Sequence, residues 1–160
     1  MRRLHPLIAT VLLVLSGAKT ALCADAPELT TALIQKVLSA AVAKAQELKV
    51  PMGIAVVDAG GSLVGFIRME GAFIHTYYTS QAKAYTAASV RKPTHATGIP
   101  ANVAAEIVSA TGARFTTLAG GFPLVLEGKT LGGIGVGGGN AEQDIAVAKA
   151  GAEALTAPSP

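Results

Sequence analysis

The sequence of 160 residues contains 13 basic and 10 acidic side chains, and its pI is about 9.2. Only 4% of the residues are aromatic, there is no tryptophan, and there is one cysteine. One cysteine excludes an internal disulfide framework and a Cys-based metal centre. A nucleic-acid-binding protein usually combines a basic stripe with stacking aromatic side chains, so we expect no nucleic-acid partner.

The first 23 residues have the layout of a secretory signal peptide. Two arginines open the chain, an apolar run follows over residues 7–15, and small side chains precede Cys23. The run is too short to cross a bilayer as a helix, which needs about 20 apolar residues. A buried N-terminal core helix is the alternative, but Lys19 interrupts the apolar pattern. We therefore expect cleavage near Cys23, a periplasmic or secreted protein, and one mature domain over residues 24–160 without a transmembrane segment.

The basic pI belongs mostly to this leader. It holds three basic residues, Arg2, Arg3 and Lys19, and no acidic residue, so 10 of the 13 basic residues remain to balance the 10 acidic ones. A domain with almost no net charge and a large apolar fraction associates readily. We expect a homo-oligomer.

The N-terminal half of the domain has the pattern of a helix followed by a β-hairpin. Thr30 or Thr31 can cap a helix whose apolar residues recur at three- and four-residue spacing as far as Leu48. Residues 52–57 and 63–69 are two β-rich runs on either side of an Asp-Ala-Gly-Gly turn.

The C-terminal half has two more helices, a second hairpin and a final helix. The helices are expected over residues 77–91 and 102–111, and the strands over residues 122–126 and 131–136. Asn140 is placed to cap the last helix, with Gln143 at the capping-box position.

This order of elements predicts one α+β domain. Strands joined as hairpins are antiparallel, and helices that are separated along the chain must cover the faces of the sheet. We expect an antiparallel sheet made from two β-hairpins, with helices packed on it as an α/β/α sandwich.

Several motifs together resemble a known family. They are AVVDAGG at residues 55–61, QAKAYTAA at 81–88, GGFPL at 120–124, and GGIGVGG at 132–138 followed by EQD at 142–144. The combination resembles the GlcG/HbpS haem-binding family, which also occurs as the C-terminal domain of PduO-type proteins. The resemblance covers nearly the whole mature chain and implies a profilin-like α/β/α sandwich, assembled as a tetramer or octamer.

The resemblance also implies a function. It indicates an exported haem-binding or haem-handling protein. Two alternatives stay open: an enzyme that degrades haem or acts on a small organic metabolite, and an extracellular accessory protein of a redox or haem sensor. No nucleophile–base pair stands out in the sequence, so no catalytic residue is assigned.

The glycine-rich run invites a nucleotide-binding interpretation, which the sequence argues against. Gly133, Gly135 and Gly138 fit G-x-G-x-x-G, but a dinucleotide site needs a further strand and an acid about 20 residues on. Glu142 and Asp144 fall in the first turn of the final helix and would repel a phosphate. Glycines that allow close packing of a helix on the sheet are the better interpretation.

Haem binding implied by the resemblance selects His75 as the candidate iron ligand, because a neutral imidazole can coordinate haem iron. Phe73 and Tyr78 could face the porphyrin, and Arg68 and Lys83 could pair with its propionates. Without haem, His75 would be a histidine near a helix start whose hydrogen bonds are made within the protein, and Arg68 and Lys83 would be solvated surface charges. His95 is a second histidine, expected in a loop.

Overall fold

The computed structural model of the chain describes residues 27–157. The expected signal peptide and its cleavage site lie outside the described residues. The elements are α1 (Thr31–Glu47), β1 (Gly53–Asp58), β2 (Leu63–Arg68), α2 (Thr76–Val90), the short 3-10 helix η1 (Thr94–Ala96), α3 (Ala101–Ala110), β3 (Gly121–Leu126), β4 (Lys129–Gly137) and α4 (Ala141–Ala154). Within residues 27–157, no helix has the length and hydropathy to cross a bilayer.

The four strands form one antiparallel sheet in the order β2-β1-β4-β3. Local interactions and backbone angles account for the tight turn of each hairpin. Asp58 Oδ1 accepts hydrogen bonds from the backbone N–H groups of Gly60 and Ser62, both at 2.9 Å, and so closes the first turn. Glu127 and Gly128 both have positive φ, 51° and 76°, as the tight turns that match the twist of a hairpin require.

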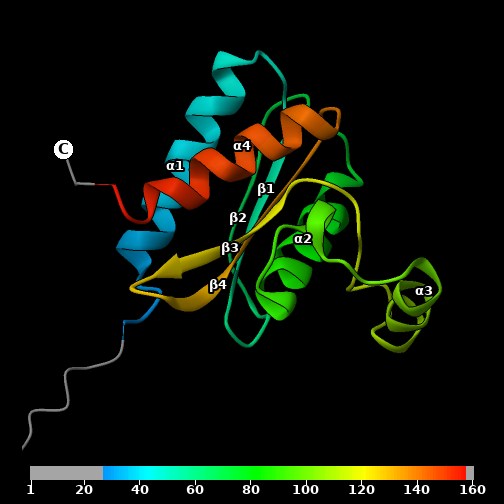
Figure 1. Cartoon of the computed structure of the whole chain (residues 1–160). Helices are drawn as coiled ribbons and strands as arrows, with labels where there is room; N and C mark the ends of the chain where they lie inside the picture. The colour runs from blue at the N-terminus through cyan, green and yellow to red at the C-terminus, as the bar shows by residue number, and fades with distance from the viewer. Residues whose placement is uncertain (1–26, 158–160) are drawn as a thin grey trace, which may run out of the picture.

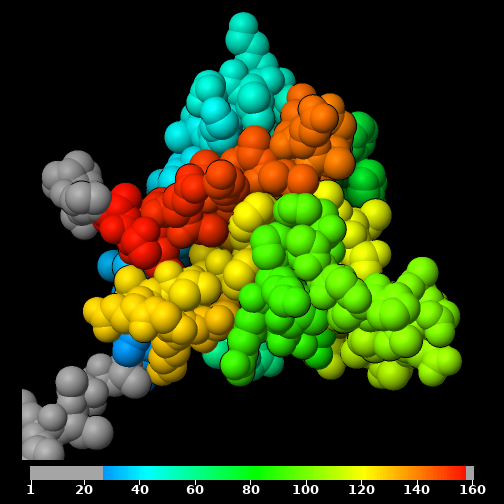
Figure 2. Space-filling view, viewed as in Figure 1, coloured from blue at the N-terminus to red at the C-terminus, as the bar shows by residue number. Residues whose placement is uncertain are grey.

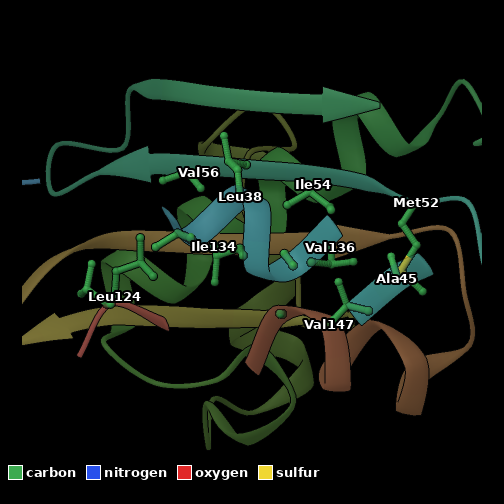
Figure 3. Packing of buried hydrophobic residues seen from close by; sticks show 13 residues of the cluster. Leu38, Ala45, Met52, Ile54, Val56, Leu124, Ile134, Val136 and Val147 are labelled. Carbon is green, nitrogen blue, oxygen red and sulfur yellow. The ribbon is translucent and has the colours of Figure 1, made fainter. Parts of the chain in front are cut away.

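One face of the sheet carries the bulky side chains of the central strands. Ile54 lies opposite Val136, and Val56 lies opposite Ile134; all four are fully buried. Helices α1 and α4 pack side by side on this face (Figure 1). Figure 3 shows Val147 of α4 among these strand residues. Each buried aliphatic side chain stabilises the fold by about 1.5–3 kcal/mol, so this layer is the main core.

On the other face the two central strands carry mainly small residues, and α2 lies directly on it. The residues of β1 and β4 that point to this face are also paired: Ala55 lies opposite Gly135, and Val57 lies opposite Gly133. A Cβ added at Gly135 would overlap the carbonyl oxygen of Ser80 in α2. The helix therefore rests on peptide backbone, which confirms close helix–sheet packing as the role of these glycines.

The structure confirms the expected sandwich, with bounds that differ by one or a few residues from those expected. The helix expected over residues 77–91 runs over Thr76–Val90. Thr30 Oγ1 caps α1 by accepting from the Leu33 N–H at 3.3 Å. Asn140 and Gln143 form a reciprocal capping box at α4, both hydrogen bonds measuring 2.9 Å. Local capping chemistry thus places both helix starts correctly.

The chain between α2 and β3 leaves the body of the protein. Helix α3 stands apart from the sandwich (Figure 1) and forms a separate lobe on the surface (Figure 2); Ala104 is its one buried residue. The chain returns through the buried Phe115. Thr94 Oγ1 then donates to the Leu118 carbonyl at 2.6 Å and accepts from the Gly121 N–H at 3.0 Å. These bonds fix the segment that leads into β3.

Candidate functional site: a polar pocket beside the start of α4

A pocket of about 300 Å³ lies between α2, the end of β4 and the start of α4. It is lined by Phe73, His75, Thr79, Lys83, Leu118, Ala119, Gly137, Gly138, Gly139, Ala141 and Asp144. The absence of a side chain at Gly137 leaves room there, because an added Cβ would approach Thr79 Oγ1 to 3.0 Å. Backbone of the glycine run thus forms one wall of the pocket.

Helical periodicity explains how α2 contributes to this pocket. His75, Thr79 and Lys83 are four residues apart, and side chains at that spacing lie above one another on one helix face. His75 occupies the N-cap position, where it makes no side-chain capping hydrogen bond. Lys83 lies two turns further on, at the closed end of the pocket. The exposed imidazole of His75 therefore lies at the mouth of the pocket, and the buried ammonium group of Lys83 lies inside it.

A buried ion pair closes the inner end of the pocket. Lys83 Nζ lies 2.7 Å from Asp144 Oδ2, and the two side chains are 5% and 7% exposed. The ammonium also donates to the Val136 carbonyl at 2.7 Å, and Asp144 Oδ1 accepts from the Gly139 N–H at 3.0 Å. Burial raises the pKa of the Asp144 carboxyl, and the Lys83 hydrogen bond and charge oppose that rise. This end of the pocket is polar but nearly neutral in total charge.

The mouth of the pocket is aromatic. The His75 ring stacks on the Phe73 ring, with centroids 5.5 Å apart and planes 12° from parallel. Both residues are exposed, and the His75 ring nitrogens make no hydrogen bond within residues 27–157. An imidazole nitrogen without a protein partner is free to coordinate a metal.

The structure brings together three of the residues selected from the sequence and places two elsewhere. His75, Phe73 and Lys83 line this pocket. Tyr78 lines a different cavity, on another face of α2. Arg68 ends the edge strand β2, where it pairs with Gly53, and it does not line the pocket. Lys83 differs from the expected propionate partner because its charge is already matched by Asp144.

The second histidine lies outside this pocket as well. His95 is exposed in η1, and its ring centroid is 5.8 Å from that of Phe122 at a 52° tilt. The described residues hold no group of three or more His, Cys, Asp or Glu side chains able to bind a metal ion. A metal at the pocket would therefore depend on a single imidazole from this chain, which suits a metal that a porphyrin already holds.

Sequence reasoning missed Asp144, Thr79 and Leu118 as pocket residues. Asp144 follows the helix cap, so its sequence position indicates a carboxylate that stabilises the helix dipole; instead it is buried against α2. The signal available was the pairing of an acid in the EQD motif with the lysine of QAKAYTAA. Only the tertiary fold shows that these two motifs meet.

Comparison with known proteins shows which family this chain matches. Residues 29–153 match the family model described as haem degrading protein HbpS-like. An uncharacterised 15.0 kDa protein of Citrobacter freundii is 36% identical over 124 residues, 76% of this chain and 87% of that protein. GlcG of Escherichia coli K12 is 35% identical over 108 residues, 68% of this chain and 80% of that protein. A crystal structure of a PduOC–haem complex matches with a TM-score of 0.74 at 29% identity, covering 81% of this chain and 96% of that one.

The matched region begins just before α1 and ends near the end of α4, so it includes the whole sandwich and the pocket. The resemblance that the sequence motifs indicate is thereby confirmed. The chain belongs to the GlcG/HbpS family of HbpS-like proteins.

Proposed function

We propose that this protein binds haem at the pocket beside the start of α4, with His75 as the iron ligand. The observation that carries the proposal is the His75 imidazole, which lies at the mouth of a pocket, stacked on Phe73 and without a hydrogen-bond partner in residues 27–157. The match to a PduOC–haem complex supports the choice of haem among possible ligands.

The shape of the site fits haem bound by its edge. A volume of about 300 Å³ is at the lower end of ligand pockets, so part of a porphyrin would extend over the rim. The rim offers apolar area for it, because Phe73 is 61% exposed and Leu118 is 57% exposed. Burial of such surface contributes about 25 cal/mol per Å². Haem bound there would have its macrocycle on the aromatic rim and its iron at His75.

The buried ion pair has a supporting role in this proposal. Because Asp144 already compensates Lys83, the inner pocket supplies little net charge to a propionate. The anionic edge of haem would then face solvent, and its apolar macrocycle would lie against the exposed apolar side chains of the rim, outside the polar inner end. The chain's own groups thus orient the ligand by excluding its charged edge from the interior.

A haemin titration of the purified protein tests this function. We expect a Soret band that saturates at a fixed ratio of haemin to protein and differs from the band of free haemin. A broad, non-saturating increase would contradict a defined site. The family description favours haem degradation as a second candidate function. Bleaching of the bound Soret band by peroxide, with release of iron and bilin-like products, would support that alternative.

We further propose that the protein is exported and that it assembles as a homo-oligomer, either tetramer or octamer. Seven of the ten residues of α3 are apolar and Val103 is 44% exposed, although isolated helices this short are marginal in water. A second copy of the chain that covers α3 would explain why this helix is so apolar.

The two proposals have separate tests. Light scattering should give a multiple of the mature mass, and a stable monomer would contradict assembly. Mass spectrometry of the exported protein should find residues 1–23 removed, and a chain that retains Met1 would contradict export.

A further inference from the structure

A second cavity of about 300 Å³ lies on a different face of α2. Tyr78, Ala82 and Tyr85 line it, and they are spaced at four and three residues, so they share one helix face. The His75, Thr79 and Lys83 face turns toward the other pocket. One helix therefore serves two separate cavities.

Apart from Gln81 and the cation at the rim, the residues that line this second cavity are aromatic, aliphatic or glycine. Val57 and Leu63 from the first hairpin face Tyr78 and Tyr85 across it. Gly61 lies close against the Tyr85 ring, because a Cβ there would come within 2.7 Å of two ring carbons. The ring is thus held by the hairpin turn. A flat apolar ligand would find two phenol rings and two aliphatic side chains around it.

One cation lies at the rim of the cavity. The Arg114 guanidinium carbon is 5.1 Å from the centre of the Tyr85 ring, within the range of a cation–π contact. Its Nε is 3.4 Å from the Thr111 carbonyl, and within residues 27–157 the guanidinium pairs with no carboxylate. Ala113 takes a positive φ of 65° just before it, a backbone conformation unusual for a residue with a side chain. The chain thus turns so that Arg114 reaches back over the cavity.

We propose that this cavity binds a small aromatic carboxylate. A single aromatic ring fits between the tyrosine and aliphatic walls, and the planar guanidinium can bind a carboxylate in bidentate fashion. A volume of about 300 Å³ is at the lower end of ligand pockets and suits a molecule with a single ring. The charge of Arg114 selects the acid over a neutral ring of the same shape.

Benzoate is the probe, and benzyl alcohol is its neutral counterpart. In ¹H–¹⁵N spectra of the full chain, saturating benzoate should shift the amide signals of Tyr85, Ala113 and Arg114 and leave those of Thr79 and Gly137 in place. Benzyl alcohol should bind about tenfold more weakly, because it forfeits a charge-assisted hydrogen-bond pair. Arg114→Gln should weaken benzoate binding by a similar factor and leave benzyl alcohol unchanged.

Two further variants separate binding from folding. Ala82→Leu fills the cavity with a good helix former on a half-buried helix position, so it should abolish benzoate binding without lowering the unfolding midpoint. Lys92→Gln removes an exposed cation outside the cavity and should change nothing. Benzoate shifts centred on Thr79, equal affinity for the neutral probe, or undiminished binding to Arg114→Gln would overturn the proposal. None of the three variants changes a residue that lines the pocket beside α4, so haemin binding should stay the same in each and the two sites are tested separately.

Discussion

Lys83 and Asp144 join the two helical layers of the protein across the end of β4. Their Nζ and Oδ2 atoms are 2.7 Å apart, although α2 and α4 lie on opposite faces of the sheet. The Val136 carbonyl shares the same ammonium, so the pair also ties both helices to β4. Within residues 27–157 it is the one ion pair between different elements that is shielded from solvent.

Removal of one partner of this pair should be costly. Lys83→Met leaves a buried carboxylate without its counter-ion, and we expect the free energy of unfolding to fall by about 3–5 kcal/mol. Urea denaturation followed by circular dichroism measures the loss. The matched control is Lys83→Met with Asp144→Leu, which removes both charges and should recover most of the stability. A single variant that loses less than about 1 kcal/mol would show that the pair contributes little.

The same variant should change how stability depends on pH. Burial raises the pKa of the Asp144 carboxyl, and the Lys83 hydrogen bond and charge lower it, so loss of Lys83 should raise that pKa further. Between about pH 4 and the raised pKa the folded state then holds a proton that the unfolded state has released. The stability gained from this proton is complete below about pH 4 and is lost as the pH rises through the raised pKa.

The stability deficit of Lys83→Met should therefore be largest near neutral pH and shrink in acid. Urea midpoints of wild type and variant, compared between about pH 3 and pH 8, check this. A deficit that is constant across the range would mean that Asp144 does not titrate differently in the two folded proteins.

His75→Ala should alter the haemin complex without altering the protein. His75 is exposed and makes no capping hydrogen bond, so its loss should change the unfolding free energy by less than about 0.5 kcal/mol. Haemin affinity should fall modestly, since apolar area supplies most of it, while the Soret and visible bands shift clearly. His95→Ala is the matched control and should leave the spectrum unchanged. The reverse pattern would identify His95 as the ligand.

Thr94→Val should loosen the segment that carries Leu118 to the pocket. The fully buried hydroxyl bonds to the Leu118 carbonyl and the Gly121 N–H, and valine keeps the shape but leaves both groups unpaired. We expect a loss of about 2 kcal/mol or more in thermal or urea unfolding. Thr117→Val, at an exposed position, should stay within about 0.5 kcal/mol. Equal effects of the two variants would remove the special role of Thr94.

Gly135→Ala should prevent normal folding. The new methyl group would overlap the Ser80 carbonyl oxygen in α2, and both backbones are held by helix and sheet hydrogen bonds. We expect loss of soluble protein or a destabilisation above about 4 kcal/mol, the range of severe core changes. Gly60→Ala, in an exposed turn where the nearest atom is a side-chain oxygen at 3.3 Å, should fold normally. A well-folded Gly135→Ala protein would mean that α2 can move away from the sheet.

Local chemistry made the elements predictable. The unbroken apolar run Ile54-Ala55-Val56-Val57 in β1 marks a strand that is buried on both of its faces. The Asn140–Gln143 capping box marks the start of α4 to the residue. Such signals lie within a few positions of one another, so they can be recognised without the fold.

The candidate site was only partly predictable, because its residues meet through tertiary structure. Lys83 and Asp144 are 61 positions apart, and their separate motifs give no indication of contact. Tyr78 is three positions from His75, yet the helix turns it toward another cavity. The sequence also did not predict that α3 stands apart from the sandwich. Its sequence is that of an ordinary amphipathic helix, and its position depends on the course of the chain before and after it.

The contact of α2 with the bare backbone of β4 has a consequence for how such a protein can diversify. Main-chain atoms at Gly133 and Gly135 lie directly against α2, so this contact does not depend on the side chains that α2 presents to the two cavities. Substitutions at Thr79 can reshape one cavity while those at Ala82 reshape the other, and neither need displace the helix. Single substitutions along α2 can therefore change the ligand preference of either cavity independently of the other.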